Sequence, residues 1–211
     1  MDIIMLFQAW ILVMALGIDA FACSFGYGTN KIKIPFSSAM LINVIGTLLL
    51  AIGLYAGAAI GRFLPEGAAG LIAFAILFCL GISKIFDSTI KRLIRKYNGI
   101  DKDFTFSFFR LAFILKVYAD PEEADFNKSK VLSPKEAAPL AIALGLDGLS
   151  VGFGIGLTSI SIFLILGLSL ISDLLAILFG AYLGNKLAQR VNLDLSWISG
   201  VILIIIAILS L

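Results

Sequence analysis

The chain has 211 residues and a net charge of +2; 60% of the residues are hydrophobic, only 14% are charged, and the mean hydropathy is +1.05. Soluble domains carry about 25% charged residues, so this composition excludes a soluble globular protein. The absence of histidine and the presence of only two cysteines exclude an imidazole base, a histidine-bound zinc and a disulfide framework. We therefore predict an all-α integral membrane protein that is not an enzyme and binds no nucleic acid.

Six apolar segments follow one another along the chain, and a helix that spans a bilayer needs ~20 apolar residues. The segments cover residues 3–27, 36–61, 68–90, 137–157, 160–183 and 196–211. We interpret residues 1–90 as a first unit of three transmembrane helices, 91–136 as a cytoplasmic loop, and 137–211 as a second unit of three helices.

The basic residues lie almost entirely on one side of this topology. Fourteen of the 16 lysines and arginines fall in the loops after the first, third and fifth segments, whereas Arg62 falls on the opposite side and Lys84 inside the third segment. Cytoplasmic loops carry such an excess of basic residues. The pattern predicts a multi-pass protein of the bacterial plasma membrane with both termini outside.

The loop of residues 91–136 is the longest polar stretch of the sequence. It opens with a basic cluster that suits anionic lipid headgroups. The phenylalanine-rich segment Phe104–Tyr118 follows, which we expect to lie in the membrane interface because it is too short and too charged to span. The loop then becomes acidic over Asp120–Asp125.

The sequence contains an internal repeat. Residues 15–28 (ALGIDAFACSFGYG) and 143–156 (ALGLDGLSVGFGIG) align without a gap and are identical at seven of fourteen positions. Three predicted spans separate the two copies, so the copies run in opposite directions across the bilayer. This is the inverted-repeat plan of secondary transporters, which bind their substrates near the midplane between the halves.

Each copy of the repeat contains one aspartate, Asp19 or Asp147. At ~1.5 Å per residue both carboxylates lie ~12 Å from the cytoplasmic edge, where an acid costs ~2.5–3.5 kcal/mol and usually marks an ion pathway. Small residues at every fourth position beside them allow the two helices to approach. Without histidine, such a site suits a hard divalent cation such as Mn²⁺, Mg²⁺ or Ca²⁺. The alternative is a pair of protonated acids that are hydrogen-bonded between helices.

Other side chains with oxygen or sulfur atoms in the same spans are candidate ligands of this midplane site. They are Cys23, Asn43, Ser150 and Asp173. Asp173 lies in the middle of a span, close to Ser169, and could supply an oxygen ligand or a step of a proton relay. Packing is the simpler role for Cys23, and a hydrogen bond between helices is the simpler role for Asn43.

The paired motifs GIDAFACSFGYG and GLDGLSVGFGIG resemble those of the MntP-type manganese exporters, six-span bacterial proteins of the LysE superfamily. The resemblance extends over nearly the whole chain. It implies efflux of a divalent cation, with Asp19 and Asp147 at the positions of the two acids that are essential in that family.

The sequence departs from the family pattern at several positions. Gly46 stands where the manganese exporters carry a glutamate in the second span, and Ser83 and Asp87 replace an arginine and a glutamate in the third span. Asp173 is additional. These differences and the long acidic loop are more similar to the sporulation-associated YtaF branch, and they bear on the identity of the ion rather than on cation handling.

The acidic loop contains a second candidate cation site. Residues 125–136 (DFNKSKVLSPKE) follow the spacing of an EF-hand calcium loop, with side-chain oxygens at positions 1, 3, 5, 9 and 12 and a backbone carbonyl at position 7. The residues concerned are Asp125, Asn127, Ser129, Val131, Ser133 and Glu136. Lys130 replaces the usual turn glycine, so we expect weak binding of Ca²⁺. The alternative is a capping box at the start of the fourth span, formed by Ser133 and Glu136.

We therefore predict a secondary transporter that exports a divalent cation, with Mn²⁺ as the first candidate and no cofactor besides the ion. No nucleotide-binding motif is present in the sequence. The alternative is a structural or regulatory membrane protein of sporulation that binds an ion without exporting it. An intramembrane aspartyl enzyme is disfavoured because the motifs that usually surround such acids are missing. The lipid bilayer and the ion are the expected partners, and the sequence leaves open a homo-oligomer.

The basic bias gives a first testable prediction. Alkaline phosphatase fused after Leu211 should be active, because this enzyme folds only outside the cytoplasm, and green fluorescent protein fused at the same position should stay dark. A fluorescent fusion would contradict the predicted orientation and would move the acidic loop to the outside.

Overall fold

The computed structural model describes residues 3–85, 129–158, 161–187, 204 and 208. In the three continuous stretches the chain forms five helices. They are α1 (Ile3–Thr29), α2 (Phe36–Gly61), α3 (Glu66–Ile85), α6 (Pro134–Gly156) and α7 (Ile162–Leu187). Nearly all of the predicted sixth span at 196–211, and the predicted interfacial segment Phe104–Tyr118, lie outside the described residues.

Four of these helices are long and apolar enough to cross a bilayer. The spanning stretches are Trp10–Thr29, Phe36–Gly61, Pro134–Gly156 and Ile162–Lys186. The apolar part of α3, Gly67–Ser83, is shorter. The chain is thus an all-helical, multi-pass membrane protein, and the helix bounds differ from the predicted segments by a few residues, except for α2, whose bounds agree.

Proline and a capping box decide where two of the helices begin. Pro35 has extended backbone angles and precedes α2. Ser133 precedes α6, with Pro134 in the first turn, and the capping box predicted for this position is present. The backbone N–H and the hydroxyl of Ser133 donate to Glu136 Oε2 at 2.9 and 2.6 Å. Because of this cap, α6 starts three residues before the predicted apolar segment.

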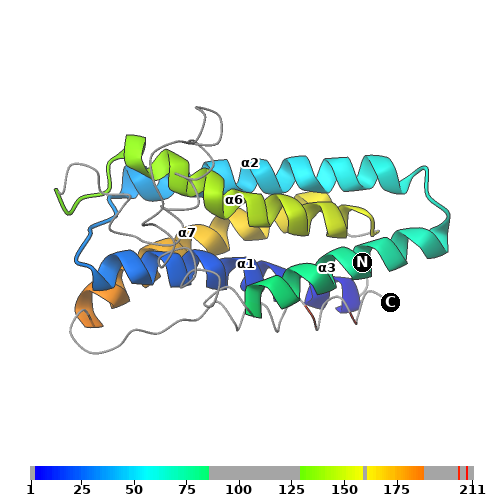
Figure 1. Ribbon diagram of the computed structural model, residues 1–211, viewed down its shortest axis with the longest axis horizontal. Coiled ribbons are helices and arrows are strands. Elements are labelled where there is room, and N and C mark those ends of the chain that lie inside the picture. The colour runs from blue at the N-terminus through cyan, green and yellow to red at the C-terminus, as the bar shows by residue number, and fades with distance from the viewer. Residues whose placement is uncertain (1–2, 86–128, 159–160, 188–203, 205–207, 209–211) are drawn as a thin grey trace, which may run out of the picture.

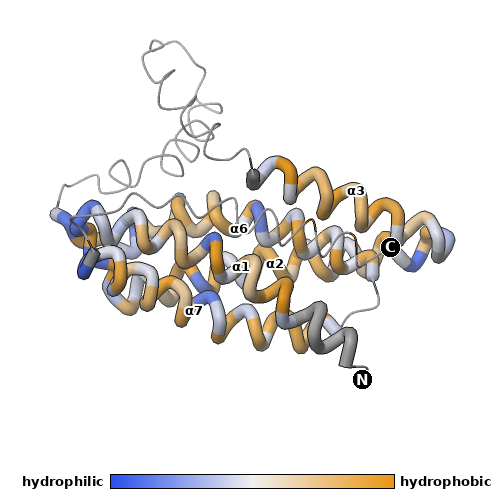
Figure 2. The backbone as a smooth tube through the Cα atoms, turned by 90° about the horizontal axis from the view of Figure 1, so that it is seen from below, coloured by the Kyte–Doolittle hydropathy of each residue, from blue (hydrophilic) through white to orange (hydrophobic). Residues whose placement is uncertain are grey.

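The four long helices pack as two pairs. The main contacts are those of α1 with α7 and of α2 with α6, while α2 also touches α7. Figure 1 shows these four helices running side by side along the long axis of the molecule. The α3 helix packs mainly on α6, and in Figure 2 it lies outside the group of four, with mostly hydrophobic residues along it.

Glycines bring each pair of helices into backbone contact. A Cβ atom added at Gly184 of α7 would meet the carbonyl oxygen of Phe25 in α1, and a Cβ added at Gly57 of α2 would meet the carbonyl oxygen of Phe153 in α6. Phe25 and Phe153 are aligned positions of the internal repeat, and the interval from Gly57 to Gly184 matches theirs to within a single position. The two helix pairs therefore use the same contact at equivalent positions of the sequence.

Two apolar clusters fill the interior of the four-helix group at different heights. We call the first the α1-start cluster; its buried members are Leu12, Val13, Ala15, Leu50, Leu54, Leu77, Val151, Ile155 and Ile165. We call the second the α1-end cluster; its buried members are Tyr27, Ile32, Ala39, Ile42, Leu132, Ala137, Leu140, Ala141 and Ile177. The level between them contains the predicted midplane residues.

The α1–α2 loop is joined to the segment before α6. The backbone N–H of Lys33 donates to Lys130 O at 2.8 Å, and that of Leu132 donates to Lys33 O at 2.9 Å, which makes a short parallel bridge between Lys33 and Val131. The hydroxyl of Ser38 donates to Leu132 O at 2.6 Å in a buried position. These bonds hold the beginnings of α2 and α6 together.

The glycine contacts give a prediction about stability. Gly57→Ala and Gly184→Ala should each destabilise the protein, by about 1–3 kcal/mol as for other overpacked interiors, because the added methyl meets a backbone carbonyl that has no room to move. Thermal unfolding of the purified protein in detergent measures the effect. Gly167→Ala is the matched control, since a Cβ there meets nothing within 4 Å; equal melting temperatures for all three variants would contradict the prediction.

Candidate functional site

A small cavity lies between the two apolar clusters, where α1, α2, α6 and α7 meet. Its volume is about 50 Å³, which is room for a cation and a few oxygen ligands or water molecules. Most of its lining is apolar or glycine, and five of the lining side chains are polar. These are Asp19, Asn43, Asp147, Ser169 and Asp173.

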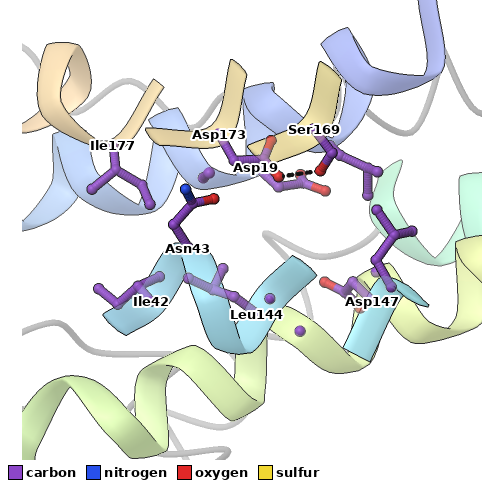
Figure 3. A pocket seen from close by; sticks show the side chains of 14 residues that line it. Asp19, Ile42, Asn43, Leu144, Asp147, Ser169, Asp173 and Ile177 are labelled. Atoms are coloured by element: carbon purple, nitrogen blue, oxygen red, sulfur yellow. Dashed lines mark hydrogen bonds between the residues drawn. The ribbon is translucent and has the colours of Figure 1, made fainter. Parts of the chain in front are cut away.

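The polar side chains come from all four helices and face the cavity from different sides. Figure 3 shows Asp19 of α1 beside Asp173 and Ser169 of α7, with Asn43 of α2 next to them and Asp147 of α6 across the cavity. No lysine or arginine is among the lining residues. Three carboxylates in an apolar setting without a basic neighbour create a site that favours a positively charged ligand.

Two oxygen atoms at this cavity have no hydrogen-bond partner among the described residues. Ser169 Oγ donates to Asp173 Oδ2 at 2.6 Å, while Asp173 Oδ1 accepts no bond there. Asn43 Nδ2 donates to the backbone oxygen of Leu170 at 2.8 Å, and Asn43 Oδ1 is left without a donor. Since Asn43 is only 2% exposed, its amide oxygen is a buried acceptor that a cation could satisfy.

The carboxylates are arranged around the cavity rather than gathered at one point. Over the described ranges, no group of three or more carboxylate or thiol side chains is close enough to hold a metal ion directly. Asp147 faces Asp19 and Asp173 across the open space (Figure 3). Coordination by both sides at once requires them to approach, or requires water molecules between the ion and one of the carboxylates.

Two of the predicted ligands lie away from the cavity. Cys23 packs against the α1-end cluster, and Ser150 Oγ donates to Leu146 O of its own helix at 3.0 Å; neither residue belongs to the lining. Conversely, Gly46 and Gly148 line the cavity. Gly148 belongs to the small-residue stripe of the second motif, whereas no sequence signal assigns Gly46 to the lining.

The second candidate site is described only in part. Asp125 and Asn127 lie outside the described residues, as does Asp87 of the third span. Lys130 has a φ of 57°, the left-handed conformation that glycine adopts most easily, so the chain makes this turn without a glycine. Glu136 is buried and engaged in the capping box. Binding of Ca²⁺ by this loop stays a prediction.

Known proteins resemble the chain in sequence. Residues 106–211 match the family Mntp, described as "Putative manganese efflux pump". "Probable sporulation protein YtaF" of Bacillus subtilis (strain 168) is 25% identical over 204 residues, which cover 95% of this chain and 97% of that protein. "Putative manganese efflux pump MntP" of Yersinia pestis (strain Pestoides F) is 28% identical over 201 residues, with 92% and 88% covered. No solved structure matches the chain.

The family match covers the second copy of the repeat, with Asp147, and both helices that follow it in the predicted topology. The two relatives extend over nearly all of the chain, including the first copy with Asp19. This agrees with the resemblance of the paired aspartate motifs. The chain therefore belongs to the Mntp family.

Proposed function

We propose that this protein is a secondary transporter that exports a divalent cation, with Mn²⁺ as the first candidate, from the cytoplasm across the bacterial plasma membrane. The proposal puts the ion in the midplane cavity. The observation that supports it most strongly is the meeting of three carboxylates from three helices at one interior cavity whose lining has no basic residue. The family match supports the same substrate class.

The donor atoms around the cavity fit a hard cation. Carboxylate, amide and hydroxyl oxygens prefer Mn²⁺, Mg²⁺ and Ca²⁺, whereas thiolate and imidazole ligands select Zn²⁺ and Cu²⁺. Cys23 lies away from the cavity, and the chain has no histidine. A divalent ion would also offset two of the three negative charges that the cavity would otherwise bury, which reduces the cost of keeping carboxylates at this depth.

The arrangement of the helices suits alternating access. Asp19 belongs to the α1·α7 pair and Asp147 to the α2·α6 pair, so the ion would bind at the junction of the two pairs. An apolar cluster closes the cavity on each side along the helices. In the proposed cycle the pairs, as parts of an inverted repeat, rock against each other and open one cluster at a time. Proton exchange or the membrane potential would drive export.

The second candidate function is a structural or regulatory role in sporulation, in which the protein binds an ion without exporting it. The observation that favours it is the similarity to the Bacillus subtilis protein named as a probable sporulation protein, which extends over 97% of that protein. Transport across the membrane separates the two functions.

Expression in a bacterial host that lacks its own manganese exporter tests export directly. The wild-type chain should lower the manganese content of cells grown in excess Mn²⁺, measured by mass spectrometry, and should restore growth. A correctly inserted protein that leaves the manganese, magnesium and calcium contents of the cells unchanged would favour the sporulation role.

Amide variants test the site. Asp19→Asn and Asp147→Asn should each slow efflux of Mn²⁺ from preloaded cells by about tenfold or more, the effect of losing ~1.4 kcal/mol of ion binding, because each removes a charged ligand while keeping its shape. Both variants should insert and melt like the wild type. Thr158→Val is the control, since this hydroxyl bonds to Ile155 O at the end of α6, away from the cavity. Wild-type efflux by the double amide variant would assign both acids to packing.

A further inference from the structure

We propose that positions 46 and 173 are equivalent places on the two sides of the cavity, so that the third acidic ligand can be moved from Asp173 to Gly46 with cation binding retained. The inference rests on the proposed function. It adds that the site is one-sided: the α1·α7 pair supplies two carboxylates, the α2·α6 pair supplies one, and the vacant fourth place is at Gly46.

The equivalence follows from the register of the helix contacts. A Cβ added at Gly180 would meet Phe21 O, and one added at Gly53 would meet Leu149 O. Phe21 and Leu149 are aligned positions of the repeat, and Gly53 and Gly180 are separated by the same interval as Gly57 and Gly184. The same shift along α2 and α7 relates position 46 to position 173.

The crossing of α2 and α7 shows the same relation. Asn43 of α2 donates its hydrogen bond to Leu170 of α7, the residue 127 positions further on. A residue that contacts its own counterpart lies on the axis that relates the two halves of a twofold arrangement. Positions 46 and 173 are each three residues further along their helices, so both lie within one helical turn of this axis, and both line the cavity.

The surroundings of the two positions also correspond. Asp173 lies beside Asp19 on one side of the cavity (Figure 3). By the same shift Gly46 lies beside Asp147, and a Cβ added at the neighbouring Gly148 would be 3.9 Å from Gly46 O. A Cβ added at Gly46 itself meets no atom within 4 Å. An aspartate at position 46 therefore has open space at the cavity next to Asp147.

The cavity offers an independent sign of a ligand besides its acids. Asn43 lines the cavity and is 2% exposed, and its Oδ1 has no donor among the described residues. This residue lies at the crossing of α2 and α7, so its oxygen can serve an ion bound toward either side. One difference between the sides remains: Ser169 donates to Asp173, whereas its counterpart Ile42 has no hydroxyl. We therefore expect a transferred acid to work less well than Asp173.

The test measures binding of Mn²⁺ to the purified full-length protein in detergent, from the electron paramagnetic resonance signal of the free ion. Asp173→Asn should weaken binding by about tenfold or more. Adding Gly46→Asp to this variant should restore the affinity to within about tenfold of the wild type, the remainder reflecting the missing hydrogen bond to a charged group. The matched control adds Gly167→Asp instead, because Gly167 is equally open but does not line the cavity, and it should restore nothing.

The outcomes separate this inference from the proposed function. A wild type that binds neither Mn²⁺ nor competing Mg²⁺ or Ca²⁺ overturns both. A wild type that binds Mn²⁺, with no loss in Asp173→Asn, no recovery with Gly46→Asp, or equal recovery with Gly167→Asp, overturns the inference and leaves the transporter proposal standing. Misfolding of the single Gly46→Asp variant, detected by its melting temperature, also overturns the inference, because position 46 would then lack the open space.

Discussion

The close approach of backbones within the α1·α7 and α2·α6 pairs is the constraint on which the rest of this structure depends. Lipid chains are as apolar as leucine, so helices in a bilayer gain little from hiding apolar surface and associate through tight packing instead. Gly57 and Gly184 provide that packing at equivalent places. Larger residues there would push the members of each pair apart, and the four helices would then no longer enclose the cavity between them.

The cavity joins two opposite requirements. Its acids need a polar ligand or water, while the apolar clusters on either side exclude water from the helix interior. The hydrogen bonds at the cavity satisfy these side chains only in part, since Asp173 and Asn43 each keep one oxygen without a donor among the described residues. A polar centre in an apolar layer costs stability, and ion binding offsets this cost in the proposed cycle.

The sequence allows the spans and the two central acids to be predicted, because long apolar runs and a repeated motif are local signals. Nearness in sequence assigns Cys23 and Ser150 to the site as well. The structure places both away from the cavity, since Cys23 packs into an apolar cluster and Ser150 bonds to its own helix. The meeting of Asn43 with α7 depends on which helices pair, and the role of Gly46 depends on a missing side chain; neither leaves a pattern in the sequence.

The bridge between Lys33 and Val131 has a mechanical consequence. With the covalent α1–α2 loop, its two backbone hydrogen bonds tie both helix pairs together at one end. The 26 residues of α2 extend over ~39 Å at ~1.5 Å per residue. A rotation of about 10° that pivots on the tied end would shift the far end of such a helix by roughly 7 Å and leave the loops nearly in place. Opening the α1-start cluster is therefore compatible with an intact bridge, whereas opening the α1-end cluster, which includes Ile32 and Leu132 beside the bridge, requires these bonds to break.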